Sequence, residues 1–198
     1  MSGSRQHGLL VVLSGPSGVG KTTIVREVLR RLGGTFSVSA TTRAAAANEQ
    51  EGRDYFFVTE ETFKQMIAAD EFLEHACVFG KTWYGTPRKA VLDQLQRGEL
   101  VILDIDVQGG QQVKKRLPEA LTIFIEPPNE EELLRRLRAR RREDDATIER
   151  RFAEAKVEMA AAHSSGTYDE FVINDDLELA INAICSLIER RRKAVNAC

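Results

Sequence analysis

The sequence predicts an α/β protein in which a central parallel β-sheet is covered by helices on both faces. Three apolar runs, at residues 9–13, 100–106 and 121–125, have the length and composition of buried parallel strands. Patterns typical of helices separate them, and such alternation favours an open, doubly wound sheet. Ligands of such sheets bind at the carboxyl ends of the strands, so functional residues are expected there.

A glycine-rich loop follows the first predicted strand. Residues 15–22 read Gly-Pro-Ser-Gly-Val-Gly-Lys-Thr, which matches the phosphate-loop pattern G-x-x-x-x-G-K-[ST]. A helix is expected over residues 23–32, and this strand–loop–helix context disfavours a chance match. Backbone N–H groups would cradle phosphates, Lys21 would reach the β- and γ-phosphates, and Thr22 would ligate Mg²⁺. The residues predicted to bind ATP here are Gly15, Pro16, Ser17, Gly18, Val19, Gly20, Lys21, Thr22 and Thr23.

Composition narrows the class of protein. The chain has 198 residues, 42% hydrophobic and 29% charged, which is typical of a globular protein rather than a disordered one. A net charge of −2 favours neither nucleic acid nor an anionic membrane as a partner. The polar residues 1–8 and the short run 9–13 predict neither a signal peptide nor a membrane span. Three widely spaced cysteines suggest reduced thiols in a cytoplasmic protein.

Two stretches interrupt the regular alternation. Residues 37–90 are β-rich, and residues 129–151 are rich in arginine. Most of these arginines are expected on solvated helix faces, although one or two reaching a triphosphate would have a different role. The other expected elements are strands at 35–42, 54–58, 72–79 and 170–173, a loop at 81–87, and helices at 60–69, 87–97, 130–142, 146–163 and 177–192.

Several sequence blocks together resemble guanylate kinases, over roughly residues 9–190. Besides the phosphate loop, they are Val-Ser-Ala-Thr-Thr-Arg at 38–43, Gly-Arg-Asp-Tyr-Phe-Phe-Val at 52–58, Glu-Phe-Leu-Glu at 71–74, Trp-Tyr-Gly-Thr at 83–86, Ile-Leu-Asp-Ile-Asp-Val-Gln-Gly at 102–109 and Val-Ile-Asn-Asp-Asp at 172–176.

This resemblance implies transfer of a phosphoryl group from ATP to GMP or dGMP, with Mg²⁺. It also implies three parts: a core ATP-binding domain (1–36, 91–128 and 152–198), a GMP-binding insertion (37–90) and a lid (129–151). The phosphate oxygen of GMP is already anionic, so no general base is required and catalysis depends on alignment and charge. The catalytic residues implied are Lys21, Arg43, Arg140 and Arg151, with Arg136 a weaker candidate.

Guanine recognition follows from the same resemblance. Glu74 would accept both the N1–H and the 2-amino group, a donor pair that adenine lacks. One of Asp104 and Asp106 would orient waters on Mg²⁺ and the other would face GMP, and either assignment is open. The GMP-binding residues implied are Ser39, Arg43, Tyr55, Glu74, Tyr84, Thr86, Asp104 and Asp106, while Asn174 and Asp175 would lie near the adenine of ATP.

The sequence departs from the family pattern at position 46. Guanylate kinases usually carry a second arginine three residues after the first, and here Arg43 is followed by four alanines, with Ala46 at that position. A weakened GMP site is therefore expected, and Arg53 is the nearest cationic residue that could compensate.

Two other functions remain compatible with the sequence. One is a guanylate-kinase-like module that binds a protein partner without turnover, and only Ala46 favours it. The other is a nucleotide kinase with a different acceptor. The intact Gly20-Lys21-Thr22 sequence favours an active enzyme.

Overall fold

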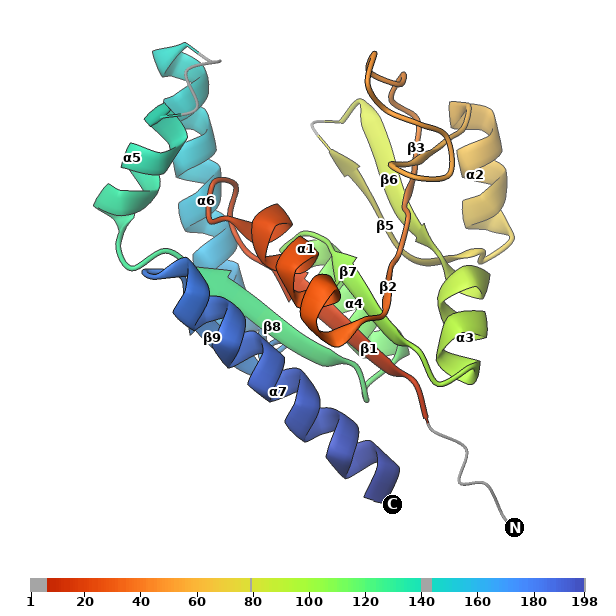
Figure 1. Cartoon of the computed structure of the whole chain (residues 1–198). Helices are drawn as coiled ribbons and strands as arrows, with labels where there is room; N and C mark the ends of the chain where they lie inside the picture. The colour runs from red at the N-terminus through yellow and green to blue at the C-terminus, as the bar shows by residue number, and fades with distance from the viewer. Residues whose placement is uncertain (1–6, 79, 140–143, 198) are drawn as a thin grey trace.

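The main sheet has five parallel strands. The structure, a computed structural model, describes residues 7–78, 80–139 and 144–197. The strand order is β2-β7-β1-β8-β9, with β1 at the centre (Figure 1). The register pairs Leu13 of β1 with Asp104 of β7, so both strands end at the same edge. The strands are β1 (Leu9–Ser14), β2 (Thr35–Phe36), β7 (Leu100–Asp104), β8 (Leu121–Glu126) and β9 (Glu170–Ile173).

Helices cover both faces of this sheet, as the sequence predicts. One face packs against α1 (Lys21–Leu32) and α7 (Leu177–Ala197), where alternate β1 side chains such as Val11 meet Ile24 and Ile184. The opposite face packs against α3 (Arg88–Gln96) and α4 (Val107–Arg116) through Val12, Val91 and Val113. Because successive strand side chains point to opposite faces, an uninterrupted apolar run fills both layers. The three-layer α/β class is therefore confirmed.

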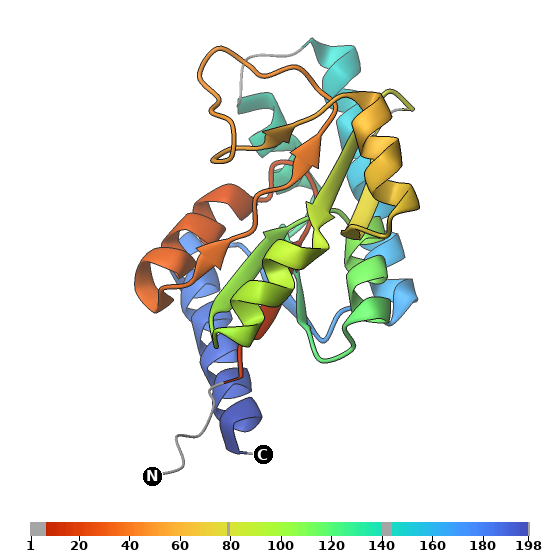
Figure 2. The same cartoon turned by 90° about the vertical axis from the view of Figure 1, so that its right-hand side faces the viewer.

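A second, four-stranded sheet has the order β4-β3-β6-β5. Its strands are β3 (Ala40–Thr41), β4 (Phe56–Phe57), β5 (Phe72–Val78) and β6 (Thr82–Pro87), and α2 (Glu60–Ala68) packs against it. Phe63 of α2 stacks on Phe72 with ring centroids 4.4 Å apart, which gives this sheet a small core of its own. Figure 2 shows this unit rising from the same end of the main sheet as the helices α5 (Glu130–Ala139) and α6 (Asp145–Ser165).

The helices α5 (Glu130–Ala139) and α6 (Asp145–Ser165) form the other projection. They pack through Leu133, Leu137 and Ile148. Because α6 is continuous, the predicted boundary at 151/152 falls inside it, and the division into core, insertion and lid stays a prediction. Although α6 and α7 each have 21 residues, no helix in the described ranges is long and apolar enough to cross a membrane.

Two local predictions were wrong, and one helix was not predicted. Residues 35–42 form two short strands in different sheets rather than one strand. Residues 82–87 form β6, not a loop, because they pair with both β3 and β5. The helix α4 was not predicted, since two glycines and several polar residues dilute its apolar pattern.

Candidate active site

The phosphate loop joins β1 to α1. Gly20 precedes the helix with a φ of 100°, a conformation that side chains disfavour, and a Cβ there would lie 2.8 Å from Asn174 Nδ2. The first turn of α1 contains no acidic residue, whereas Glu60 and Glu61 occupy the first turn of α2. The positive end of α1 is thus left for an external anion.

Contacts around the loop come from three parts of the chain. Lys21 Nζ donates to the carbonyl oxygens of Gly15 at 2.5 Å and Pro16 at 3.2 Å, so its ammonium lies over the loop. The buried Asn174 donates to Val19 O at 2.7 Å. Arg151 of α6 donates to Ser17 Oγ, so the first turns of α6 lie at the loop. Lys21, Asn174 and Arg151 therefore surround the phosphate loop, and the binding of ATP there stays a prediction.

A cavity of about 320 Å³ lies between the two sheets, beside the loop. Its wall combines the second sheet with the carboxyl end of β7. The lining residues are Ser39, Tyr55, Glu74, Ala76, Val78, Tyr84, Asp104, Ile105 and Asp106. Six of the predicted GMP-binding residues are therefore brought together, and Thr86 joins them through Glu74.

Glu74 is the buried charged residue of this cavity. Only 5% of it is exposed, and its Oε1 accepts a hydrogen bond of 2.6 Å from Thr86 Oγ1. Helix α4 crosses closely behind it, since a Cβ on Gly109 would lie 2.9 Å from Glu74 Oε2. Burial raises the pKa of Glu74 to about 7, with Asp106 adding to the effect and the hydrogen bond from Thr86 opposing it. A buried acceptor of this kind is suited to a ligand that offers N–H donors.

Arg43 lies at the end of β3 beside two tyrosines. Its Nε donates to Tyr84 Oη at 3.3 Å, and its guanidinium lies 5.3 Å from the Tyr55 ring centroid. Glu49 accepts from both terminal nitrogens at 2.8 and 2.9 Å, and Arg43 lowers the pKa of Glu49 to about 2. The sequence prediction missed Glu49, although its position six residues after Arg43 on the same loop was a signal.

Asp104 and Asp106 have different surroundings. Burial raises the pKa of Asp104, while the nearby Lys21 ammonium lowers it, so this carboxyl group links the cavity to the phosphate loop. Asp106 is exposed and caps α4 by accepting from Gly109 N at 2.8 Å. Asp104 is therefore the better candidate to face a loop-bound cation, and Asp106 has a structural role as well.

A second cavity of about 500 Å³ continues the first toward α6. Both cavities include Ala76, Val78 and Asp106, while Arg150 and Glu158 line only the second. Glu158 was not among the predicted residues. Burial raises its pKa, and Lys21 opposes that effect, so Glu158 lies within the electrostatic range of the phosphate loop.

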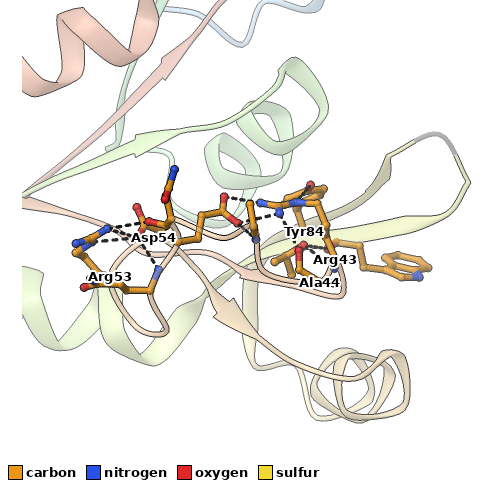
Figure 3. Close-up of polar contacts among 11 residues, drawn as sticks. Arg43, Ala44, Arg53, Asp54 and Tyr84 are labelled. Carbon is orange, nitrogen blue, oxygen red and sulfur yellow. Dashed lines mark hydrogen bonds and ion pairs between the residues drawn. The ribbon is translucent and has the colours of Figure 1, made fainter.

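Other candidate residues are placed differently. Arg53 does not line the cavity: its side chain is 59% exposed and forms an ion pair of 2.8 Å with Asp54 (Figure 3). Arg136 pairs with Glu132 at 2.6 Å on its own helix. Thr22, Thr23 and Asp175 are exposed, and the predicted catalytic Arg140 lies outside the described residues.

The sheet order, the phosphate loop and the cavity beside it define a phosphate-loop nucleotide-binding protein of the α/β class. Residues 7–191 match the guanylate kinase family. The guanylate kinase of Fusobacterium nucleatum is 46% identical over 182 residues, which cover 92% of this chain and 96% of that protein. That of Gloeobacter violaceus is 49% identical over 180 residues, or 90% of this chain and 86% of that protein.

A solved structure gives the same result. The crystal structure of guanylate kinase from Anaplasma phagocytophilum superposes with a TM-score of 0.75 at 34% identity, covering 95% of this chain and 88% of that one. The chain belongs to the guanylate kinase family. The resemblance inferred from the sequence blocks is thereby confirmed.

Proposed function

We propose that this protein is an ATP:GMP phosphotransferase that converts ATP and GMP, or dGMP, into ADP and GDP or dGDP. Membership of the guanylate kinase family supports the class of reaction. The structural observation that carries the assignment of the acceptor is the buried carboxyl group of Glu74, in a cavity beside the phosphate loop. We assign a base-binding role to the cavity and a triphosphate-binding role to the loop.

Guanine is the base that suits Glu74. Its N1–H and 2-amino groups lie on one edge, so an ionised carboxyl group accepts from both, whereas adenine would leave the buried charge without these donors. Thr86 already donates a hydrogen bond to Glu74 Oε1, which orients the carboxyl group for the base. Ser39, on the cavity wall, adds a further hydroxyl for the base edge.

Phosphoryl transfer requires alignment of two anions and stabilisation of the charge between them. Lys21 and Arg151 lie at the loop, where they would contact the triphosphate. Arg43, Tyr55 and Tyr84 form a separate group, where the phosphate of GMP would bind. Arg140 is proposed as a further lid residue from the resemblance alone.

Mg²⁺ fits the donors at this site. Thr22 and Asp104 supply a hydroxyl and a carboxyl oxygen, and no group of three His, Cys, Asp or Glu among the described residues could hold a metal by itself. This pattern suits Mg²⁺, which commonly retains waters and binds substrate phosphates through one or two protein ligands. When bound, the ion would neutralise charge on the triphosphate.

The test is release of ADP in a coupled assay with GMP, dGMP, AMP, CMP and UMP as acceptors. GMP and dGMP should be the preferred acceptors, and omission of Mg²⁺ should abolish turnover. No turnover with any acceptor would favour the protein-binding module, and preference for another monophosphate would reassign the cavity. We place the activity in cytoplasmic purine nucleotide metabolism, in keeping with the bacterial relatives.

A further inference from the structure

The guanidinium of Arg43 is held on one side by its own loop. Nη1 donates to Ala44 O at 2.8 Å and to Glu49 Oε2 at 2.9 Å, and Nη2 donates to Glu49 Oε1 at 2.8 Å (Figure 3). Both carboxyl oxygens of Glu49 therefore accept hydrogen bonds from the end of the guanidinium. Bidentate contacts of this kind fix the plane of the group as well as its position.

The opposite edge of Arg43 remains directed at the cavity wall. A guanidinium has five N–H groups, and the contacts with Ala44 and Glu49 use three of them. Nε uses a fourth in a long contact of 3.3 Å with Tyr84, which lines the cavity. The last N–H of Nη2 shares that edge with Nε because the group is planar. Together they form a second fork, which matches two oxygens of a phosphate that replaces the long contact with Tyr84.

Position 46 takes part in this arrangement through its backbone. Ala46 N donates to Glu49 Oε2 at 2.8 Å, and Glu49 N donates to Ala46 O at 3.0 Å. These reciprocal bonds close a turn that keeps Glu49 against Arg43. The Glu49 side chain is 23% exposed, so neighbouring groups partly shield the pair from solvent.

We propose that Glu49 is a positioning residue for the acceptor phosphate: it pins the end of Arg43 so that the Nε–Nη2 edge faces the phosphate of GMP. This inference rests on the proposed function, because it takes the cavity as the GMP site. In this proposal the carboxylate of Glu49 favours the binding of an anion, the phosphate of GMP. The effect comes from pre-organisation of Arg43 and outweighs the like-charge repulsion between Glu49 and the phosphate.

If Glu49 had the opposite role, the effect of its removal on GMP binding would also be opposite. If Glu49 instead competes with the phosphate for Arg43, its removal would strengthen GMP binding. Replacement by glutamine separates the two roles, because it removes the charge and one acceptor while keeping the size of the side chain. Glu60→Gln is the matched control, since Glu60 forms an exposed ion pair with Lys64 on α2 of the same unit.

The experiment is calorimetric titration of the whole protein with GMP and, separately, with guanosine, which has the base but no phosphate. Glu49→Gln should weaken GMP binding about tenfold or more, the effect of losing one charge-assisted contact, and should change guanosine binding by less than about twofold. Glu60→Gln should change neither. Glu49→Asp, which keeps the charge on a shorter side chain, should bind GMP more tightly than Glu49→Gln.

Several outcomes would overturn the proposal. They are tighter or unchanged GMP binding by Glu49→Gln, equal weakening of GMP and guanosine binding, and a wild-type protein that binds GMP no better than guanosine. Turnover of the wild type in the ADP-release assay is scored separately. A protein that binds GMP with the expected pattern but transfers no phosphoryl group would contradict the proposed function and leave this inference standing.

A double-mutant cycle tests whether Glu49 acts through Arg43. Lysine cannot form the two-pronged contact, so in an Arg43→Lys background the further change Glu49→Gln should alter GMP affinity by less than about twofold. Effects that add fully would show that Glu49 acts independently of Arg43, and would also overturn the proposal. Unchanged thermal unfolding of the variants confirms that the fold is retained.

Discussion

Thr86 Oγ1 donates a hydrogen bond of 2.6 Å to Glu74 Oε1, across the paired strands β6 and β5. Thr86 is fully buried, and Glu74 is 5% exposed. The hydroxyl therefore fixes one oxygen of a carboxyl group that has little contact with water. Because β5 and β6 are antiparallel neighbours, the pair is rigidly placed, which is the arrangement that selective recognition of a base requires.

Replacement of Lys21 by alanine should lower kcat by about 10³-fold or more, because the loop would lose its charge on the transferring group. Folding should be preserved, since the Lys21 ammonium lies over the loop and donates to the carbonyl oxygens of Gly15 and Pro16. The measurement is steady-state ADP release, with the exposed Lys64→Ala as control and circular dichroism to verify the fold. Near-normal turnover would mean that the loop does not bind ATP.

Glu74→Gln should reduce discrimination between GMP and AMP by on the order of 1–3 kcal/mol. Glutamine keeps an acceptor for Thr86 but presents an amide donor where guanine also donates. Competition between the two nucleotides in steady-state turnover measures the ratio of their kcat/KM values. Selectivity that stays at the wild-type level would refute the assignment of Glu74 to the base.

The affinity for guanosine should depend on pH through Glu74. Burial raises the pKa of this carboxyl group to about 7, so the ionised form that accepts both guanine donors predominates only above that pH. Below pH 7 a proton must be released on binding, and affinity should fall on the order of tenfold per pH unit. Guanosine is the probe because it carries no titrating phosphate. The Glu74→Gln protein should give a flat profile between pH 5 and 8, and a flat wild-type profile would contradict this prediction.

Ala46→Arg should lower KM for GMP about tenfold, because a second guanidinium adds a charge-assisted contact with the phosphate. The sequence suggests Arg53 as a substitute for the missing arginine, but in the structure Arg53 forms an ion pair with Asp54. Arg53→Ala alone should therefore leave KM nearly unchanged. If it raises KM sharply and Ala46→Arg rescues it, Arg53 does compensate. If Ala46→Arg has no effect in either background, phosphate binding does not depend on position 46.

Much of the fold could be predicted because its signals are local. The runs that form β1, β7 and β8 are predominantly apolar, as burial on both faces demands, and the phosphate loop is one contiguous motif. The strand β6 was not predicted, because its turn-like residues form a strand only when β3 and β5 pair with its two edges. The propensity of residues 82–87 alone does not contain that information.

The sequence by itself determined the phosphate loop, the order of the family blocks and most of the residues that meet in the cavity. Only the tertiary structure decided which charged groups pair. It placed Glu49 on Arg43, Asp54 on Arg53 and Lys21 near Asp104. The physical reason is that any of these carboxylates could neutralise a nearby cation. Which one does so depends on distances of a few ångströms, and strand pairing and loop closure set those distances.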